Sequence, residues 1–263
     1  MTRTEQIKAL NAMLLEEMPE FRKQAEAFAP DQAAQRRLLR SLMNVRPPTP
    51  LNPEFLALQD ALLRAEAEEK GVVNALSLPV TACHPRLAVW QGDITRLNTD
   101  AIVNAANCAL LGCFVPCHGC IDNAIHSAAG LQLRDECARI MAAQGHPEPN
   151  GQAKLTAGYN LPARFVLHTV GPVISGAVTG RDRAELASCY RACLELAAAH
   201  HLESVAFCCI STGEFHFPNQ PAAEIAVETV TAFLRQNRSI QRVIFNVFKD
   251  RDAAIYRTLL GVV

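Results

Sequence analysis

The chain has 263 residues, of which 49% are hydrophobic and 19% are charged, and its formal net charge is −1. This length fits one large domain or a large domain joined to a small one, and the apolar content supplies a core, which excludes a disordered chain. A nearly neutral chain has no broad basic surface for a nucleic-acid backbone, so we expect no direct nucleic-acid readout, and any nucleotide ligand must be small and held in a pocket.

Residues 1–80 are predicted to form a helical extension. Its first helix begins with a capping box, Thr2-x-x-Glu5, and one face carries apolar residues at helical spacing: Ile7, Leu10, Leu14 and Met18. A second helix should begin near Asp31 and end before Pro47. A third should begin at Asn52-Pro53 and end at Gly71. Because free helices of this length are marginal, we expect their apolar faces to dock onto the rest of the protein.

Short apolar strands alternate with helices between residues 86 and 263, the predicted second domain. The predicted strands are Leu87–Gln91, Asp100–Ala105, Arg164–Thr169, Ser204–Ile210 and Arg242–Phe248. The predicted helices are Asn123–Ala142, Ala184–His200, Ala222–Arg235 and Arg251–Leu260. This alternation predicts an α/β fold with a mostly parallel sheet covered on both faces. Ligands of such sheets bind at the carboxyl ends of the strands.

The chain contains 10 cysteines, and its charged, amphipathic N-terminus does not resemble a signal peptide. We therefore expect a reducing, cytoplasmic environment in which the thiols stay free. No apolar run approaches the ~20 residues that span a bilayer, so no membrane association is expected.

Three thiols and one imidazole lie within the eight residues Cys113-Phe-Val-Pro-Cys117-His118-Gly-Cys120. Thiolate and neutral imidazole are the ligands that zinc prefers. We predict one zinc ion per chain bound by Cys113, His118 and Cys120, with a fourth position open for water or substrate, as in catalytic sites. Two alternatives stay open at this point: a closed structural zinc that also uses Cys117, and free thiols without a metal.

Three further loops follow predicted strands. Gly92-Asp93 is by itself typical of a turn. The segment Asn104-Ala-Ala-Asn107 places carboxamides, which bind sugar hydroxyls, beside small residues that let a ligand approach; the alternative is an asparagine that holds a turn. The loop Ile210-Ser-Thr-Gly213-Glu-Phe-His-Phe-Pro218 could form a nest of backbone amides for a diphosphate, although it lacks the lysine of a Walker loop.

Taken together, these segments resemble a macrodomain. The matching segments, in the family's order, are Gly92–Thr95, Asp100–Asn107, Asp122–Gly130, Gly158–Pro162, His168–Pro172 and Ile210–Gly213. The resemblance implies a three-layer α-β-α fold with a mixed, mostly parallel sheet. Macrodomains usually carry a run of glycines before Asp122. Its replacement by Cys113–Cys120, and the helical extension, resemble the zinc-dependent macrodomains that remove ADP-ribose from proteins.

The resemblance implies a role for each matched binding position. Asp93 would accept a hydrogen bond from the adenine amino group, with the Ile94 backbone close by, and Phe248 would stack near adenine. Backbone amides would wrap the diphosphate at Ser211, Thr212, Gly213 and Glu214. His216 stands where the family often has glycine.

At the distal ribose, the resemblance implies that Asn107 binds the sugar, Phe215 covers it and Asp122 acts as the base. The predicted activity is zinc-dependent hydrolysis that releases mono-ADP-ribose from a modified protein side chain. The implied partners are ADP-ribose and mono-ADP-ribosylated protein, with a cognate ADP-ribosyltransferase system as a candidate partner of a monomeric enzyme. The alternatives are a non-catalytic reader of ADP-ribose and a deacetylase of O-acetyl-ADP-ribose.

Overall fold

A seven-stranded mixed sheet forms the centre of the molecule in the computed structural model, which describes residues 1–262. In spatial order its strands are β2 (Val80–Thr81), β3 (His84–Gln91), β9 (Arg242–Val247), β8 (Ser204–Phe207), β5 (Ala101–Ala105), β7 (Phe165–Thr169) and β6 (Ala153–Ala157). The strands from β3 to β7 run parallel, and β2 and β6 pair antiparallel at the two edges. The predicted mixed, mostly parallel sheet is confirmed.

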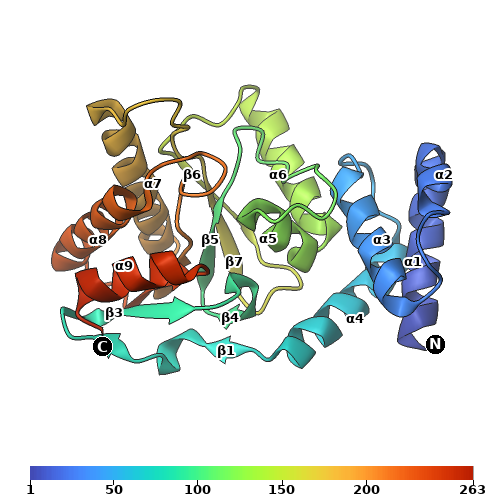
Figure 1. The fold of residues 1–263 in the computed structure, drawn as a ribbon, viewed down its shortest axis with the longest axis horizontal. Helices are drawn as coiled ribbons and strands as arrows, with labels where there is room; N and C mark the ends of the chain where they lie inside the picture. Colours follow the sequence, from blue (N-terminus) through green and yellow to red (C-terminus); the bar gives the residue numbers. More distant parts are fainter. Residues whose placement is uncertain (263) are drawn as a thin grey trace.

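Helices cover both faces of this sheet (Figure 1). The helices are α5 (Ile121–Ala129), α6 (Leu131–Gln144), α7 (Gly180–Ala199), α8 (Asn219–Gln236) and α9 (Asp250–Leu260). The first two lie on one side of the sheet and the other three gather on the opposite side. The central strands read as continuous apolar runs because both of their faces are buried. No helix within residues 1–262 has both the length and the apolar character needed to cross a membrane.

The predicted helix Asn123–Ala142 is wrong in one respect, since the structure has two helices there. Gly130 separates α5 from α6 with φ 98°, and a Cβ at this position would come within 2.7 Å of the Gln59 and Gln132 side chains. Only glycine adopts this backbone conformation without strain. Strand β8 also ends at Phe207, three residues earlier than predicted, and the antiparallel edge strand β6 was not predicted.

The N-terminal region is helical as predicted. Its long helices are α1 (Arg3–Glu17), α3 (Gln32–Val45) and α4 (Pro53–Lys70), with a 3-10 turn at Pro19–Phe21 and the short α2 (Arg22–Ala25) between the first two. Thr2 forms the predicted capping box with Glu5, and Asp31 and Asn52 cap the next two helices through their side chains. A bond between each cap and the backbone satisfies an amide that the helix leaves free.

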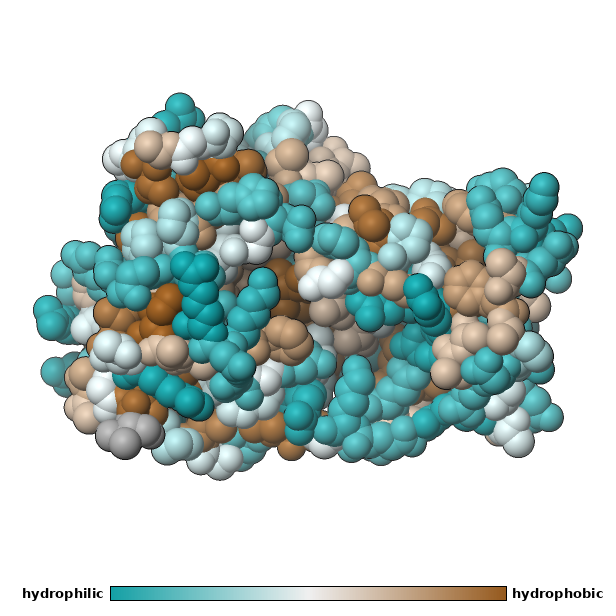
Figure 2. Space-filling model, viewed as in Figure 1, coloured by the Kyte–Doolittle hydropathy of each residue, from teal (hydrophilic) through white to brown (hydrophobic). Residues whose placement is uncertain are grey.

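The apolar faces of these helices pack against one another, contrary to the expectation that they dock onto the sheet domain. Their shared core contains Ile7, Leu10, Leu14, Met18, Leu38, Leu39, Leu42, Met43, Phe55, Leu62, Leu63 and, from α6, Leu131. Because three helices can bury their apolar stripes together, little apolar surface is left for another partner. The face of the extension in view accordingly carries few strongly hydrophobic residues (Figure 2).

Besides the apolar contact of Leu131, polar contacts join the extension to the sheet domain. Gln59 accepts a hydrogen bond from the Leu131 amide, and Asp60 accepts one from the Asn160 side chain. The connecting segment pairs with the sheet domain through β1 (Val73–Asn74) on β4 (Leu97–Asn98) and through β2 on β3. The division into residues 1–80 and 86–263 stays a prediction.

We predict that Gly130→Ala lowers the free energy of unfolding by about 1–3 kcal/mol, because it adds a close contact to the cost of a positive φ. Gly145→Ala is the matched control, since Gly145 ends α6 with φ 75° but has open space around the added methyl group. Urea unfolding of both variants measures the difference. An equal loss in both would show that the contact with Gln59 and Gln132 contributes nothing.

Candidate functional site

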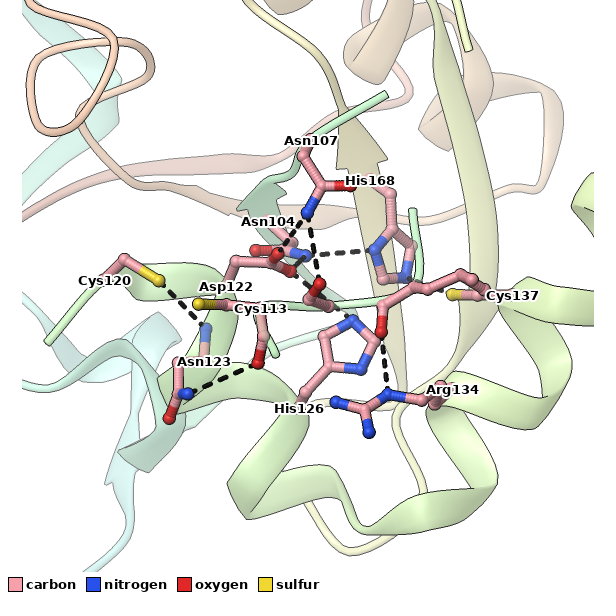
Figure 3. A network of polar contacts seen from close by, with 12 residues as sticks. Asn104, Asn107, Cys113, Cys120, Asp122, Asn123, His126, Arg134, Cys137 and His168 are labelled. Carbon is pink, nitrogen blue, oxygen red and sulfur yellow. Dashed lines mark hydrogen bonds and ion pairs between the residues drawn. The ribbon is translucent and has the colours of Figure 1, made fainter. Parts of the chain in front are cut away.

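The parallel direction of the central strands brings the predicted site loops to one edge of the sheet. Asp93 follows β3, Asn107 follows β5 and Ser211 follows β8, and these three strands run in the same direction. Helix α5 begins at the same edge, directly after the cysteine loop, and carries Asp122 in its first turn. Figure 3 shows Asn107, which follows β5, and Asp122 of α5 directed toward one another.

Asp122 is the buried charge of this region. Asn104 Nδ2 donates to its Oδ1 (2.8 Å) and Asn107 Nδ2 donates to its Oδ2 (3.3 Å), so each carboxylate oxygen has an amide partner. Burial raises the pKa of Asp122 to about 6, while the Asn104 hydrogen bond and the Arg134 charge act in the opposite direction. A carboxyl group poised near neutral pH suits proton transfer.

Asn104 extends this network into the core. Its amide also donates to His168 Nδ1 (3.2 Å), so His168 Nε2 carries the proton and donates to Thr156 Oγ1 (2.9 Å). Both ring nitrogens are therefore satisfied, and His168 is a fully buried core histidine. Burial lowers the pKa of His168 to about 3 and keeps the ring neutral.

His126 borders Asp122 one helical turn later. Its Nε2 lies 3.5 Å from Asp122 Oδ1, and neither ring nitrogen has a hydrogen-bond partner among residues 1–262. Burial, together with His168 and Arg134, lowers the pKa of His126 well below its usual value. The ring is neutral at physiological pH, so its contact with Asp122 is not an ion pair.

The ligand atoms of Cys113, His118 and Cys120 all lie within 4.8 Å of one another. Cys113 Sγ is 3.7 Å from His118 Nδ1, close to the sulfur–nitrogen separation of about 3.6 Å that tetrahedral zinc requires. The three residues therefore fit a zinc ion. Burial raises the pKa of the Cys120 thiol to about 12, so a bound cation must displace its proton.

Cys117 points away from this triad. Its Sγ lies 3.3 Å from Ser41 Oγ and 3.6 Å from the Arg37 carbonyl oxygen, both in α3. This placement favours three protein ligands over a closed set of four. A second group, formed by His126, Cys137 and His168, also has its ligand atoms within 4.8 Å. It does not fit a metal, because both nitrogens of His168 are already bonded and the group is enclosed in the core.

The loop after β8 leaves backbone donors free. The amides of Gly213, Glu214 and Phe215 donate no hydrogen bond to any residue in the range 1–262. Ser211 has φ 62° and His216 has φ 58°, so the loop turns tightly even though His216 replaces a glycine. Free amides in a tight turn form an anion-binding nest. Glu214 Oε1 lies 3.9 Å from His118 Nε2, which brings this loop close to the metal ligands.

Asp93, which follows β3, stabilises the turn in which it lies. Its Oδ1 accepts from the Thr95 backbone amide (3.0 Å) and hydroxyl (2.7 Å), and Ile94 is buried. A cavity of about 130 Å³ beside Asp93 is bounded by Arg40 of the extension and by Ser127 of α5. Phe248 is 74% exposed, so it is free to lie against a flat ligand. The predicted roles of these residues at adenine stay proposals.

Sequence reasoning missed several residues that the structure brings to the site. Asn104 begins the segment Asn104–Asn107, in which only Asn107 was assigned a role at the distal ribose. Arg134 was not noticed, although a lone arginine on the apolar face of a helix is a usable signal; it donates to the Leu111 carbonyl oxygen just before the cysteine loop. Arg40 of α3 contacts the cysteine loop at the His118 carbonyl oxygen. It also bonds Asn123, which is 83 residues away in the sequence, and no local pattern indicates such a contact.

A mostly parallel sheet with a buried carboxylate and an amide nest at its carboxyl edge places this chain among the α/β proteins that bind ligands at the ends of their strands. The chain belongs to the macrodomain family: the model of the Macro domain matches residues 103–226. A protein of Treponema medium named protein-ADP-ribose hydrolase is 50% identical over 263 residues, covering 99% of this chain and 100% of the relative.

Two further comparisons agree with this assignment. A Staphylococcus aureus (strain MSSA476) protein of the same name is 50% identical over 222 residues, which cover 84% of this chain and 82% of the relative. A mutant Oceanobacillus iheyensis macrodomain, solved with ADPR, is 39% identical with a TM-score of 0.62, covering 66% of this chain and 91% of that one. The predicted macrodomain fold is confirmed.

We predict that His168 makes stability depend on pH. The folded protein keeps His168 neutral down to about pH 3, whereas the unfolded chain protonates it near its ordinary pKa of 6.5. Stability is therefore lost as the pH falls through 6.5. Between pH 7 and pH 5 the wild type should lose about 2 kcal/mol more of its unfolding free energy than His168→Gln. The raised pKa of Asp122 acts in the opposite direction in both proteins. Urea unfolding at the two pH values measures this difference, and equal losses would contradict it.

Proposed function

We propose that this protein is a hydrolase that releases ADP-ribose from modified protein side chains with the help of one zinc ion. The observation that carries the proposal is the position of Asp122. This buried carboxyl group, with its pKa raised to about 6, lies two residues after a metal-ligand triad and shares one edge of the sheet with an amide nest. Relatives named protein-ADP-ribose hydrolase at 50% identity support the same activity.

The binding residues divide an ADP-ribose molecule between the two ends of the site. The backbone amides of Gly213, Glu214 and Phe215 take the diphosphate, because they are left without a partner at the sheet edge among residues 1–262, whereas the Thr212 amide donates to the Cys209 carbonyl oxygen. Asp93, Ile94 and Phe248 take adenine at one end. Asn107 and Phe215 take the distal ribose at the other end, where Asn107 already contacts Asp122 and the Gly112 carbonyl oxygen.

Cys113, His118 and Cys120 would hold the zinc ion at this second end. When bound, the ion supplies Lewis acidity beside the distal ribose. Three protein ligands leave one tetrahedral position for a non-protein group.

Asp122 takes the proton in the proposed hydrolysis. The bond between the anomeric carbon and the modified side chain breaks, and the oxygen of a water molecule bonds to that carbon. The proton that the water loses passes to Asp122 and then to the released side chain, so the carboxylate is regenerated. At neutral pH the carboxyl group is mostly ionised, so it is able to accept this proton. Asn104 and Asn107 fix its orientation through one hydrogen bond to each oxygen.

We predict that Asp122→Asn lowers the rate of ADP-ribose release by about 10²–10⁴-fold, because the amide cannot take up a proton at neutral pH. Release from a mono-ADP-ribosylated protein and binding of ADP-ribose by calorimetry are both measured. Binding should persist, since Asp122 is not among the proposed binding residues. Asp135→Asn is the control, because Asp135 in α6 is another carboxyl group whose pKa burial raises, but it has no proposed role in the reaction.

Two other results would assign a different function. If the zinc-loaded wild type binds ADP-ribose but never releases it from modified protein, the chain is a reader. If it cleaves O-acetyl-ADP-ribose much faster than modified protein, it is a deacetylase.

The metal proposal is tested by a pair of cysteine variants. Cys120→Ser should lose the zinc ion, because a serine hydroxyl is a poor replacement for thiolate. Cys117→Ser should keep about one zinc per chain, since the Cys117 thiol lies against α3 and outside the triad. Elemental analysis after dialysis gives the zinc content. Loss of zinc from both variants would indicate a closed four-ligand site.

A further inference from the structure

We propose that Arg40 and Asn44, in α3 of the helical extension, are positioning residues that hold the metal-ligand loop 113–120 in its binding shape. This inference rests on the zinc binding in the proposed function. It gives the extension a specific part in the site, although the extension supplies none of the three metal ligands.

Asn123 is the link between the loop and α5. Its backbone amide donates to Cys120 Sγ (3.4 Å), and its side-chain amide donates to the carbonyl oxygens of Val115 (3.0 Å) and Cys113 (3.5 Å). Asn123 is completely buried. One residue thus contacts both ends of the loop, through its backbone amide at Cys120 and through its side chain at Cys113 (Figure 3).

Arg40 fixes Asn123 from the other side. Its guanidinium donates to Asn123 Oδ1 from two nitrogens, at 2.7 and 3.2 Å. The same group donates to the carbonyl oxygen of His118 (3.3 Å), the third ligand residue. Because a guanidinium is planar and its donors are fixed, this pairing sets the orientation of both the Asn123 amide and the His118 backbone.

Asn44 holds the middle of the loop. Its Oδ1 accepts from the Cys117 backbone amide (2.8 Å), and its Nδ2 donates to Ser127 Oγ in α5 (3.0 Å). Asn44 is 1% exposed, so leaving either group unpaired would be costly. Cys117 has φ 52°, a left-handed conformation that a non-glycine residue adopts only when neighbours hold it.

Arg134 then fixes α3 relative to the loop. It donates to the carbonyl oxygens of Met43 (2.9 Å) and Arg46 at the end of α3, and to that of Leu111 before the loop. Phe114, in the loop, lies over its guanidinium at 4.3 Å. Burial lowers the pKa of Arg134 only to about 10, so its positive charge persists and favours the carbonyl end of the helix.

The test compares Arg40→Ala with Arg36→Ala. Arg36 lies one turn earlier in α3 and pairs with Glu66 of α4, away from the loop. Zinc affinity is measured on the full chain by competition with a chromophoric chelator, and the absorption spectrum of the Co²⁺-loaded protein reports the ligand geometry. We expect Arg40→Ala to weaken zinc binding by about 10–100-fold and to alter the cobalt spectrum, as loss of groups that orient metal ligands does. Arg36→Ala should match the wild type in both.

A purely structural role for Arg40 would lower the unfolding free energy without changing the cobalt spectrum, and that result overturns the inference. An unchanged zinc affinity in Arg40→Ala overturns it as well. If Arg40→Ala does not fold, Arg40→Gln, which keeps donors to Asn123 but loses the planar pair, decides by the same two measurements.

The two proposals fail separately. If the wild type binds zinc but releases no ADP-ribose, the hydrolase function is wrong while the role of Arg40 still stands or falls by zinc affinity. If the wild type binds no zinc, both the metal centre and the positioning role are wrong.

Discussion

The burial of one carboxylate, Asp122, constrains the rest of the site. A charge removed from water must be compensated by hydrogen bonds and by opposite charge, otherwise its pKa rises until it stays protonated. Here the Asn104 hydrogen bond and the charge of Arg134 limit the rise to about 6. The compensation reaches across the sheet, because Asn104 lies opposite His168 in the register of β5 and β7, and His168 bonds Thr156 of β6. The strand register therefore determines how the carboxylate is held.

A second constraint acts on the loop that faces Asp122. Residues 113–120 form neither helix nor strand, so their backbone groups depend on side chains for partners. Those partners come from α5 through Asn123 and from the extension through Arg40 and Asn44. Hydrogen bonds are directional in a way that apolar packing is not. The contacts that hold this loop to the extension are therefore polar, while most apolar residues of the extension form its own core.

The sequence predicted the parts of this structure that local rules control. Caps at Thr2, Asp31 and Asn52 located three helices, and apolar runs located the buried strands. The spacing of Cys113, His118 and Cys120 selected the three residues that the structure brings together. The break at Gly130 was missed although a glycine within a helical pattern is a local signal for a helix end. Arg40, Asn44 and Arg134 escaped because their partners are distant in sequence and carry no common motif.

Exposure differs across the site in a way that bears on its chemistry. Asp122, Asn104 and His126 are buried, whereas Cys113, His118 and Cys120 are partly exposed and Phe114 and Val115 beside them are exposed. The groups that tune the proton acceptor are thus shielded from water, which keeps their hydrogen bonds effective. The three residues proposed to bind zinc stay partly exposed, as the approach of a modified protein in the proposed reaction requires. A loop with this exposure cannot be held by burial alone, and its support by the extension follows from that requirement.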